Sequence, residues 1–333
     1  MARLPSSAVL ERRWPFVLGA IVVVQWAVVA WVASSAAHAG LHYGDPAVAG
    51  RFYGAARDGL VVVQVLVLLP LALLAIVGAM ERLAGRALAV FAGAVWILVP
   101  LLGYHYFDFR MKPAMLDRFL PEVLGLAQSS AFPAMVALAV AVYLLVATLG
   151  SRDRRRPAAA GLAASVALVL SPTTVLFLAG ALVTLAIRRR WVALGALAAG
   201  AVPGIVAAAL WNVHDPHAGA PILHWDYAQF HANLMGFREY FWSLRVVEWL
   251  PIAGTIGLLR RSIALGVGVA LWFWLTVLLR GTVVDTFSTA DPLHPSAVFL
   301  GMMLTAYPAF VLLLAALPFL VPRLQTRLAP APS

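Results

Sequence analysis

The 333-residue sequence contains no cysteine, and charged residues make up only 11% of it. The lack of cysteine excludes disulfide bonds, thiol catalysis and metal sites with cysteine ligands. Soluble globular domains have about 25% charged residues, so the low charge, together with 63% hydrophobic residues, argues against an ordinary soluble domain. This composition predicts a protein of the lipid bilayer.

Lysine is also nearly missing: Lys112 is the only one, and the rest of the basic side chains are arginine. The formal net charge of +10 would on its own suit a nucleic-acid-binding protein. The basic residues, however, form short groups between apolar runs, and the sequence has no RNA-binding or P-loop signature. This pattern is typical of membrane topology, so we expect membrane lipids and no nucleic acid as partners.

Ten apolar segments predict an all-α, polytopic transmembrane protein with a single membrane domain over residues 1–333 and interfacial helices in its outer loops. The segments are about 15–37, 59–80, 87–104, 131–149, 158–170, 172–187, 191–211, 244–259, 262–279 and 299–321. Several are shorter than the ~20 residues of a perpendicular span, so tilted, broken or re-entrant helices are expected, above all in the pair hinged at Ser171-Pro172. The first segment predicts a retained helix rather than a signal peptide, because its apolar region exceeds the usual length of about 7–15 residues.

The distribution of charge predicts the orientation. Sixteen of the 24 basic residues and only three acids lie at the amino terminus and in the turns at about 81–86, 151–157, 188–190, 260–261 and 323–327. The opposite side has eight basic and eleven acidic residues, in outer loops at about 38–58, 105–130, 212–243 and 280–298 and at their edges. The positive-inside rule then predicts a plasma-membrane protein with both termini in the cytoplasm and its titratable side chains mostly outside.

The stretch PILHWDYAQFHANLMGFREYFWSLR, residues 221–245, is rich in aromatic and cationic side chains. His224, His231, Arg238 and Arg245 recur every seven residues, so on one helix they form a slowly turning stripe beside an apolar face. Such a helix lies at a membrane surface, where the last three of them would meet a lipid phosphate or pyrophosphate. The alternative is anchoring to anionic lipid with no substrate role.

The first outer loop supplies two candidate catalytic carboxylates, Asp45 and Asp58, with Arg51 between them as a candidate phosphate contact. A carboxylate next to the membrane can act as a general base on a hydroxyl acceptor. The alternative is that Asp45 and Pro46 only cap a surface helix.

The later outer loops hold further candidates. Arg110 and Lys112 in the second loop are candidate phosphate contacts, unless they only extend from an interfacial helix towards the water. His214, Asp215 and His217 in the third loop are candidate ligands of a divalent ion, or else an ordinary polar turn. The fourth loop has the composition of a plain connector.

The order of several apolar elements resembles a known family. The elements include LVVVQVLVLLPLALLAIVGAMERLAGR at 60–86, GLAASVALVLSPTTVLFLAGALVTLAIRRRW at 161–191 and FREYFWSLRVVEWLPIAGTIGLLRRS at 237–262. In this order they resemble actinobacterial membrane proteins of the glycosyltransferase C superfamily, which use polyprenyl-phosphate sugars. The resemblance covers most of the chain from about residue 60.

The resemblance implies an inverting transfer of a sugar from a polyprenyl-phosphate donor to a cell-envelope acceptor on the outer face. It implies Asp45 as the base, and Asp58 in the same loop is the second candidate. Cationic side chains or a divalent metal ion, Mg²⁺ or Mn²⁺, would hold the phosphate.

Two other functions stay open. Relatives have a longer first outer loop, here cut to about twenty residues, and often a lysine where this chain has Ser171. The short loop favours a non-catalytic scaffold or assembly partner that keeps the fold. A lipid or small-molecule transporter would require polar residues inside the spans, of which Gln25 and Gln64 are the main ones.

Overall fold

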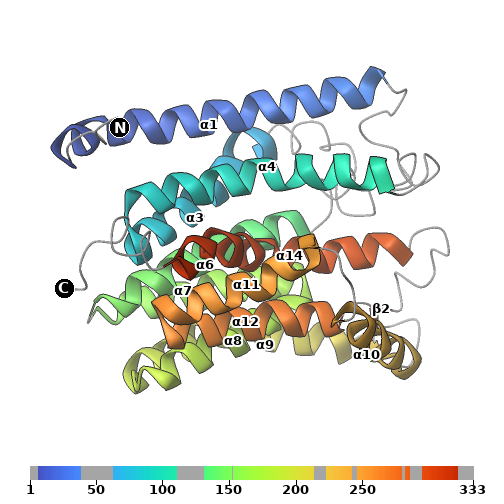
Figure 1. Cartoon of the computed structure of the whole chain (residues 1–333). Coiled ribbons are helices and arrows are strands. Elements are labelled where there is room, and N and C mark those ends of the chain that lie inside the picture. Colours follow the sequence, from blue (N-terminus) through green and yellow to red (C-terminus); the bar gives the residue numbers. More distant parts are fainter. Residues whose placement is uncertain are drawn as a thin grey trace.

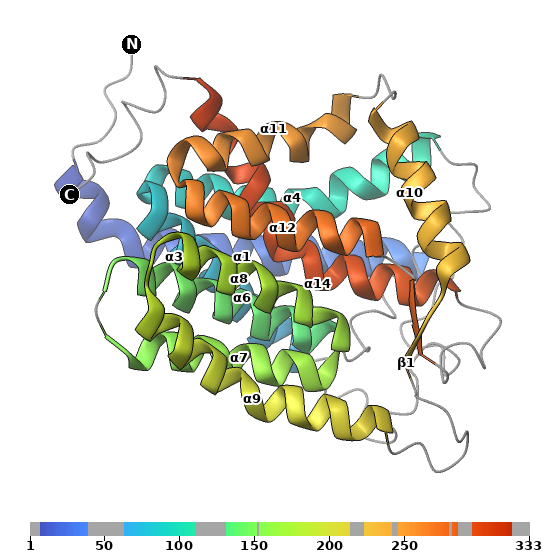
Figure 2. The same ribbon diagram turned by 90° about the horizontal axis from the view of Figure 1, so that it is seen from below.

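The computed structural model describes residues 7–38, 63–110, 131–151, 153–213, 223–241, 246–279, 282–285 and 295–321. These residues form long helices that run side by side, with one short two-stranded ribbon near one end (Figures 1 and 2). The predicted helical class is therefore confirmed for the described part of the chain, apart from this ribbon.

The helices follow the predicted apolar segments closely. In chain order they are α1 Ser7–His38, the π-helical turn η2 Gln64–Leu68, α3 Leu69–Ala84, α4 Arg86–Arg110, α6 Ala131–Leu149, α7 Arg155–Leu170, η3 Pro172–Thr174, α8 Val175–Ile187, α9 Trp191–Val213, α10 Tyr227–Phe241, α11 Val246–Arg261, α12 Ile263–Leu279, α14 Pro295–Ala315 and η4 Leu317–Leu320. The segment predicted at 131–149 coincides with α6. The hinged pair is α7 and α8, separated by Ser171 and one 3₁₀ turn.

Four helical stretches in the described residues are long and apolar enough to cross a membrane: Arg13–Ala30, Gln64–Ala84, Phe132–Leu149 and Trp191–Leu210. Four further apolar helices are shorter: Arg86–Leu98, Val175–Ile187, Ile263–Leu279 and Thr305–Leu320. Large apolar side chains such as Phe16 and Ile205 lie exposed on the outside of the bundle. These features are compatible with a membrane protein, while the number of ten crossings stays a prediction.

Helix α6 lies in the middle of the bundle and packs against α3, α7 and α14. On one side α14 packs against α11 and α12, and α12 packs against α8. On the other side α7 packs along α9. The space between these helices is filled by buried apolar side chains, among them Ile76, Met80, Leu138 and Trp272. Helix α1 lies at the edge of the bundle, against α3, α4 and η2 (Figure 1).

Helix α1 is held by a few polar contacts. Trp14 Nε1 donates a hydrogen bond of 3.2 Å to the Glu81 carboxylate, which also accepts one of 3.0 Å from Arg86 Nε. The Arg86 guanidinium carbon lies 5.3 Å from the centre of the Trp14 ring. Farther along, Trp26 Nε1 donates a hydrogen bond of 3.1 Å to the Val65 carbonyl. These contacts join α1 to α3, to the start of α4 and to η2.

Several pairs of helices, among them α7 with α9 and α8 with α12, approach so closely that only glycine fits between them. A Cβ on Gly161 of α7 would overlap the carbonyl oxygen of Leu197 in α9. Gly180 of α8 and Gly268 of α12 each face the other's carbonyl group in the same way. In lipid, small residues at a helix interface let the two backbones approach and gain van der Waals contact. These glycines therefore help decide which helices are neighbours.

The stretch 221–245 is not one helix, so the prediction of a four-residue stripe is wrong. Leu223–Trp225 form strand β1, which pairs antiparallel with strand β2, Val283–Asp285, from the predicted connector loop. Asp226 then starts α10, because its Oδ1 accepts a hydrogen bond of 3.0 Å from the backbone amide three residues later. His224 therefore lies on β1 and not on the helix. The seven-residue spacing is a local signal, whereas the strand depends on a partner in a distant loop.

Candidate functional site at the two ends of the bundle

The two ends of the bundle differ in chemistry. At one end, short turns with arginines in them or next to them join α3 to α4, α6 to α7, α8 to α9 and α11 to α12. At the other end, α10 and the ribbon lie across the ends of the long helices (Figure 2). We name these the arginine end and the α10 end. They correspond to the sides that the charge distribution predicts as cytoplasmic and outer.

The turns at the arginine end are short for local reasons. Gly85 has a φ of 87°, a conformation that L side chains rarely adopt, and it links α3 directly to α4. Ser262 Oγ accepts a hydrogen bond of 3.4 Å from the Leu265 amide and so caps α12 immediately after α11. Because the turns are short, the arginines in them and next to them all lie at the ends of helices.

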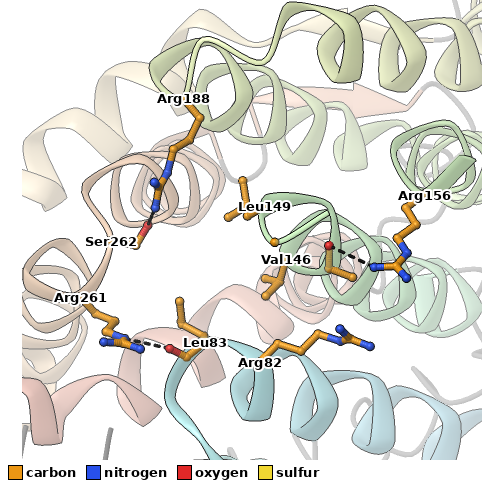
Figure 3. A pocket seen from close by; sticks show the side chains of 10 residues that line it. Arg82, Leu83, Val146, Leu149, Arg156, Arg188, Arg261 and Ser262 are labelled. Atoms are coloured by element: carbon orange, nitrogen blue, oxygen red, sulfur yellow. Dashed lines mark hydrogen bonds between the residues drawn. The ribbon is translucent and has the colours of Figure 1, made fainter. Parts of the chain in front are cut away.

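Four of these arginines line a cavity of about 360 Å³ (Figure 3). Arg82 is in the last turn of α3, Arg156 in the first turn of α7, Arg188 directly after α8, and Arg261 at the end of α11. The rest of the lining comes from the ends of α3 and α6 and from the turn before α12: Leu83, Val146, Ala147, Leu149, Gly150 and Ser262. Among the described residues that line the cavity, none is acidic.

Two of the four arginines bind the ends of neighbouring helices. Arg261 Nε donates a hydrogen bond of 2.8 Å to the carbonyl of Leu83 in the last turn of α3. Arg156 Nη1 donates one of 3.5 Å to the carbonyl of Ala147 in the last turn of α6, and its Nε lies 3.8 Å from the Asp153 carboxylate. Cations at a helix C-terminus satisfy its free carbonyl groups and oppose the negative end of its dipole. Helix packing therefore accounts for these two side chains.

The other two arginines are held by hydroxyl groups. Arg82 Nη2 donates a hydrogen bond of 3.0 Å to Tyr143 Oη, and its guanidinium carbon lies 5.1 Å from the centre of that ring. Arg188 Nη2 donates one of 3.4 Å to Ser262 Oγ. A neutral hydroxyl group orients a guanidinium group without neutralising its charge. Both charges therefore remain available to a further partner.

The α10 end is organised by one buried amide. Asn233, only 4% exposed, donates a hydrogen bond of 3.0 Å from Nδ2 to the Leu278 carbonyl at the end of α12. Its Oδ1 accepts one of 2.9 Å from Gln229 Nε2. Tyr227 and Leu234 are exposed, so apolar surface of α10 faces away from the bundle. This arrangement is compatible with a helix at a membrane surface.

Three of the predicted phosphate contacts belong to elements that meet at the α10 end. His231 and Arg238 are on α10, and Arg110 ends α4 at the same end of the bundle (Figure 2). The His231 side chain is exposed. The side chains of Arg238 and Arg110 are outside what the structure describes.

The remaining predicted site residues lie outside the described residues. They are the carboxylates Asp45 and Asp58, the phosphate contacts Arg51, Lys112 and Arg245, and the metal-ligand candidates His214, Asp215 and His217. Within the ranges that the structure does describe, no group of three or more His, Asp or Glu side chains could hold a metal ion. The predicted carboxylate pair and metal site therefore stay predictions.

The main polar residues predicted inside the spans, Gln25 and Gln64, are both buried, on α1 and on the adjoining turn η2. Buried threonines are used within their own helices: Thr184 and Thr276 each donate a hydrogen bond of 2.8 Å to the carbonyl four residues earlier.

The arginine cavity was not predicted from the sequence. In the sequence, Arg82, Arg156, Arg188 and Arg261 indicate only the topology. Their common signal is that each ends or begins a helix at a short turn on the same predicted side. That signal places them at one membrane surface, but it does not say which turns are neighbours.

Comparison of the chain with protein-family models, with curated proteins and with solved structures found no significant match.

Proposed function

We propose that the protein is a plasma-membrane enzyme that transfers a sugar from a polyprenyl-phosphate donor to a cell-envelope acceptor, with the α10 end as its working face. The observation that carries this proposal is the position of α10 across the end of the bundle, with an exposed His231 and with Arg238 two turns later. The phosphate of a membrane lipid lies at the depth of a surface helix, so a helix in the position of α10 is at the right level to meet it.

The chemistry requires a stabilised leaving group and a base. As the bond between the sugar and the phosphate oxygen breaks, negative charge grows on the lipid phosphate. Arg238, with His231 and Arg245, would stabilise that charge, and a guanidinium group can bind two phosphate oxygens at once. Asp45, or else Asp58, would accept the proton of the acceptor hydroxyl as its oxygen attacks the anomeric carbon with inversion.

Other outer-loop residues have supporting roles in this proposal. Arg51, Arg110 and Lys112 are further phosphate contacts. A divalent ion, Mg²⁺ or Mn²⁺, would neutralise phosphate charge if His214, Asp215 and His217 hold it.

The proposal includes ten crossings with both termini and the arginine end in the cytoplasm. Because the chain has no cysteine, a single introduced cysteine reports on one position without background. We expect Arg189→Cys, in the exposed turn after α8, to react with a membrane-impermeant maleimide only in inverted vesicles. Tyr227→Cys, at the exposed start of α10, should react only in right-side-out vesicles. Reaction of both from the same side would contradict this topology.

The transferase is tested with the full chain in nanodiscs and radiolabelled polyprenyl-phosphate sugars, with and without Mg²⁺ or Mn²⁺. We expect the wild type to transfer or hydrolyse the sugar. Arg238→Ala should weaken donor binding about tenfold or more, because a charge-assisted hydrogen bond to phosphate is lost. Arg154→Ala, which removes an exposed arginine from the arginine end, is the control and should bind donor like the wild type. Equal weakening in both variants would show that net charge matters and not α10.

A non-catalytic scaffold with the same fold is the second candidate, and the first outer loop of about twenty residues favours it. It predicts donor binding that needs Arg238 but no turnover in any variant. Flux of a small molecule across vesicles without lipid-linked sugar would instead indicate a transporter. Absence of both binding and turnover with every donor would rule out the sugar-transfer proposal.

A further inference from the structure

The arginine end has a cluster of cationic side chains that the proposed sugar transfer does not use, because this end lies opposite α10 (Figure 2). The cavity there, about 360 Å³, falls within the range of roughly 300–1,000 Å³ typical of small-molecule sites. Figure 3 shows Arg188 and Arg261 on one side of Val146 and Leu149, and Arg82 and Arg156 on the other. Four guanidinium groups therefore surround a small apolar floor.

Acids near the cavity are already engaged. The Glu81 carboxylate lies 3.0 Å from Arg86 Nε and also binds α1, so it is used where α1, α3 and α4 meet. Asp153 lies 3.8 Å from Arg156 and also accepts a hydrogen bond of 2.9 Å from the Arg155 amide. The other three cavity arginines, Arg82, Arg188 and Arg261, therefore form no ion pair with an acid that the structure describes.

The dipoles of the surrounding helices offset this charge only in part. The C-termini of α3, α6, α8 and α11 and the N-termini of α7 and α12 all lie at the cavity. Each terminus is equivalent to about half an elementary charge, so four negative and two positive ends together remove roughly one of the four positive charges. The cavity thus keeps an excess of positive charge that favours an anion with more than one negative charge.

The arrangement of hydrogen-bond donors favours the same kind of ligand. A guanidinium group has five N–H donors in a planar fork. The Tyr143 hydroxyl accepts from one donor of Arg82, and the Ser262 hydroxyl accepts from one donor of Arg188. The forks of Arg82 and Arg188 are not needed to satisfy helix carbonyls, and they come from opposite sides of the cavity (Figure 3). Tetrahedral phosphate oxygens can accept from several such forks at once.

We propose that this cavity binds a phosphate group, presented either by a soluble phosphate or by the headgroup of an anionic lipid. The two sources offer the same chemistry to the four arginines, and both reach the end of a membrane bundle. The proposal does not rest on the sugar transfer, since it concerns different residues at the opposite end.

The soluble source is tested with the full chain in phosphatidylcholine nanodiscs, by titration calorimetry with inorganic phosphate and with pyrophosphate. Arg82→Gln and Arg188→Gln each remove a guanidinium group whose described contacts are with a neutral side chain, Tyr143 or Ser262. Each should weaken binding about tenfold or more. Arg189→Gln is the matched control, because this exposed neighbour removes the same charge from the same turn and is not among the described lining residues. It should bind like the wild type.

The lipid source is tested by replacing part of the phosphatidylcholine with phosphatidic acid and measuring retained lipid by native mass spectrometry. If the headgroup occupies the cavity, the wild type and Arg189→Gln keep phosphatidic acid, whereas Arg188→Gln loses it. In the nanodiscs that contain phosphatidic acid, soluble phosphate then no longer binds to the wild type. If a soluble phosphate is the ligand, it binds equally in both kinds of nanodisc.

Three ligands are compared between the wild type and Arg188→Gln: soluble phosphate, pyrophosphate and phosphatidic acid. The proposal is wrong if the wild type binds none of them more tightly than the variant does. It is also wrong if Arg189→Gln loses binding to the same extent, because the effect would then come from net charge at the surface. Unfolding temperatures of all variants, measured in parallel, show whether a loss comes from the cavity or from a damaged bundle. If Arg188→Gln is damaged, Arg82→Gln and the charge-conserving Arg188→Lys decide the question.

Discussion

Replacement of Gly200 by valine is expected to disrupt the packing of α9 on α7. A Cβ at this position would overlap the carbonyl oxygen of Ala158 and lie 3.0 Å from the Leu162 nitrogen and 3.1 Å from Gly161 Cα. All three are backbone atoms, so no change of rotamer relieves the clash and the two helices have to move apart. We expect the free energy of unfolding to fall by about 3 kcal/mol.

The same helix offers the control. Gly195 is on the exposed side of α9, and a Cβ there would meet no atom within 4 Å. Gly195→Val should therefore unfold at a temperature close to that of the wild type in the same detergent, whereas Gly200→Val should unfold at a clearly lower one. Equal stability of the two variants would mean that α7 and α9 do not make this contact.

Asp45→Asn is expected to slow sugar transfer by about 10²–10⁴-fold, the usual contribution of a general base. An asparagine side chain keeps the shape of the carboxylate but cannot accept the proton of the acceptor hydroxyl. Donor binding should be unchanged, because the base acts on the acceptor and not on the lipid phosphate. Initial transfer rates and donor affinity, measured separately in nanodiscs, distinguish these two effects.

Asp58→Asn is the comparison for this experiment. A large loss in Asp58→Asn with normal transfer by Asp45→Asn would move the role of base to Asp58. Normal transfer by both variants would exclude the two carboxylates as the base.

The positions of the helices could be predicted because each depends on residues close together in the sequence. An apolar run is helical in a membrane whatever its neighbours are, and its ends are marked by local features such as Gly85, Ser171-Pro172 and the arginine turns. The segment 131–149 was therefore predicted with the same ends as α6.

The neighbours of each helix could not be predicted, because they depend on contacts between distant segments. Gly180 and Gly268 face each other across α8 and α12, while Gly195 faces open space, and nothing in the local sequence separates the two cases. The same limit applies to the arginines: the charge distribution places Arg82 and Arg188 on one side, but only the packing of four turns brings them to one cavity.

The local structure at the α10 end was predicted in part. Local periodicity found the helix that carries His231 and Arg238, since α10 is amphipathic over its own length. It failed for His224, because the ribbon of β1 and β2 joins two loops that are far apart in the chain. The carboxylates of the first outer loop, Asp45 and Asp58, lie outside the described residues, so their roles rest on the sequence alone.

The contact between α1 and α3 has a consequence for biosynthesis. Trp14 and Glu81 are 67 positions apart in the chain. At about 5–20 residues per second, a ribosome needs roughly 3 to 13 seconds to make the intervening stretch. In the proposed membrane topology, α1 has to remain stable in the bilayer during that time without the carboxylate that later binds it. Its apolar surface, which includes the outward-facing Phe16 and Val23, suits α1 to that position before its partner helices are made.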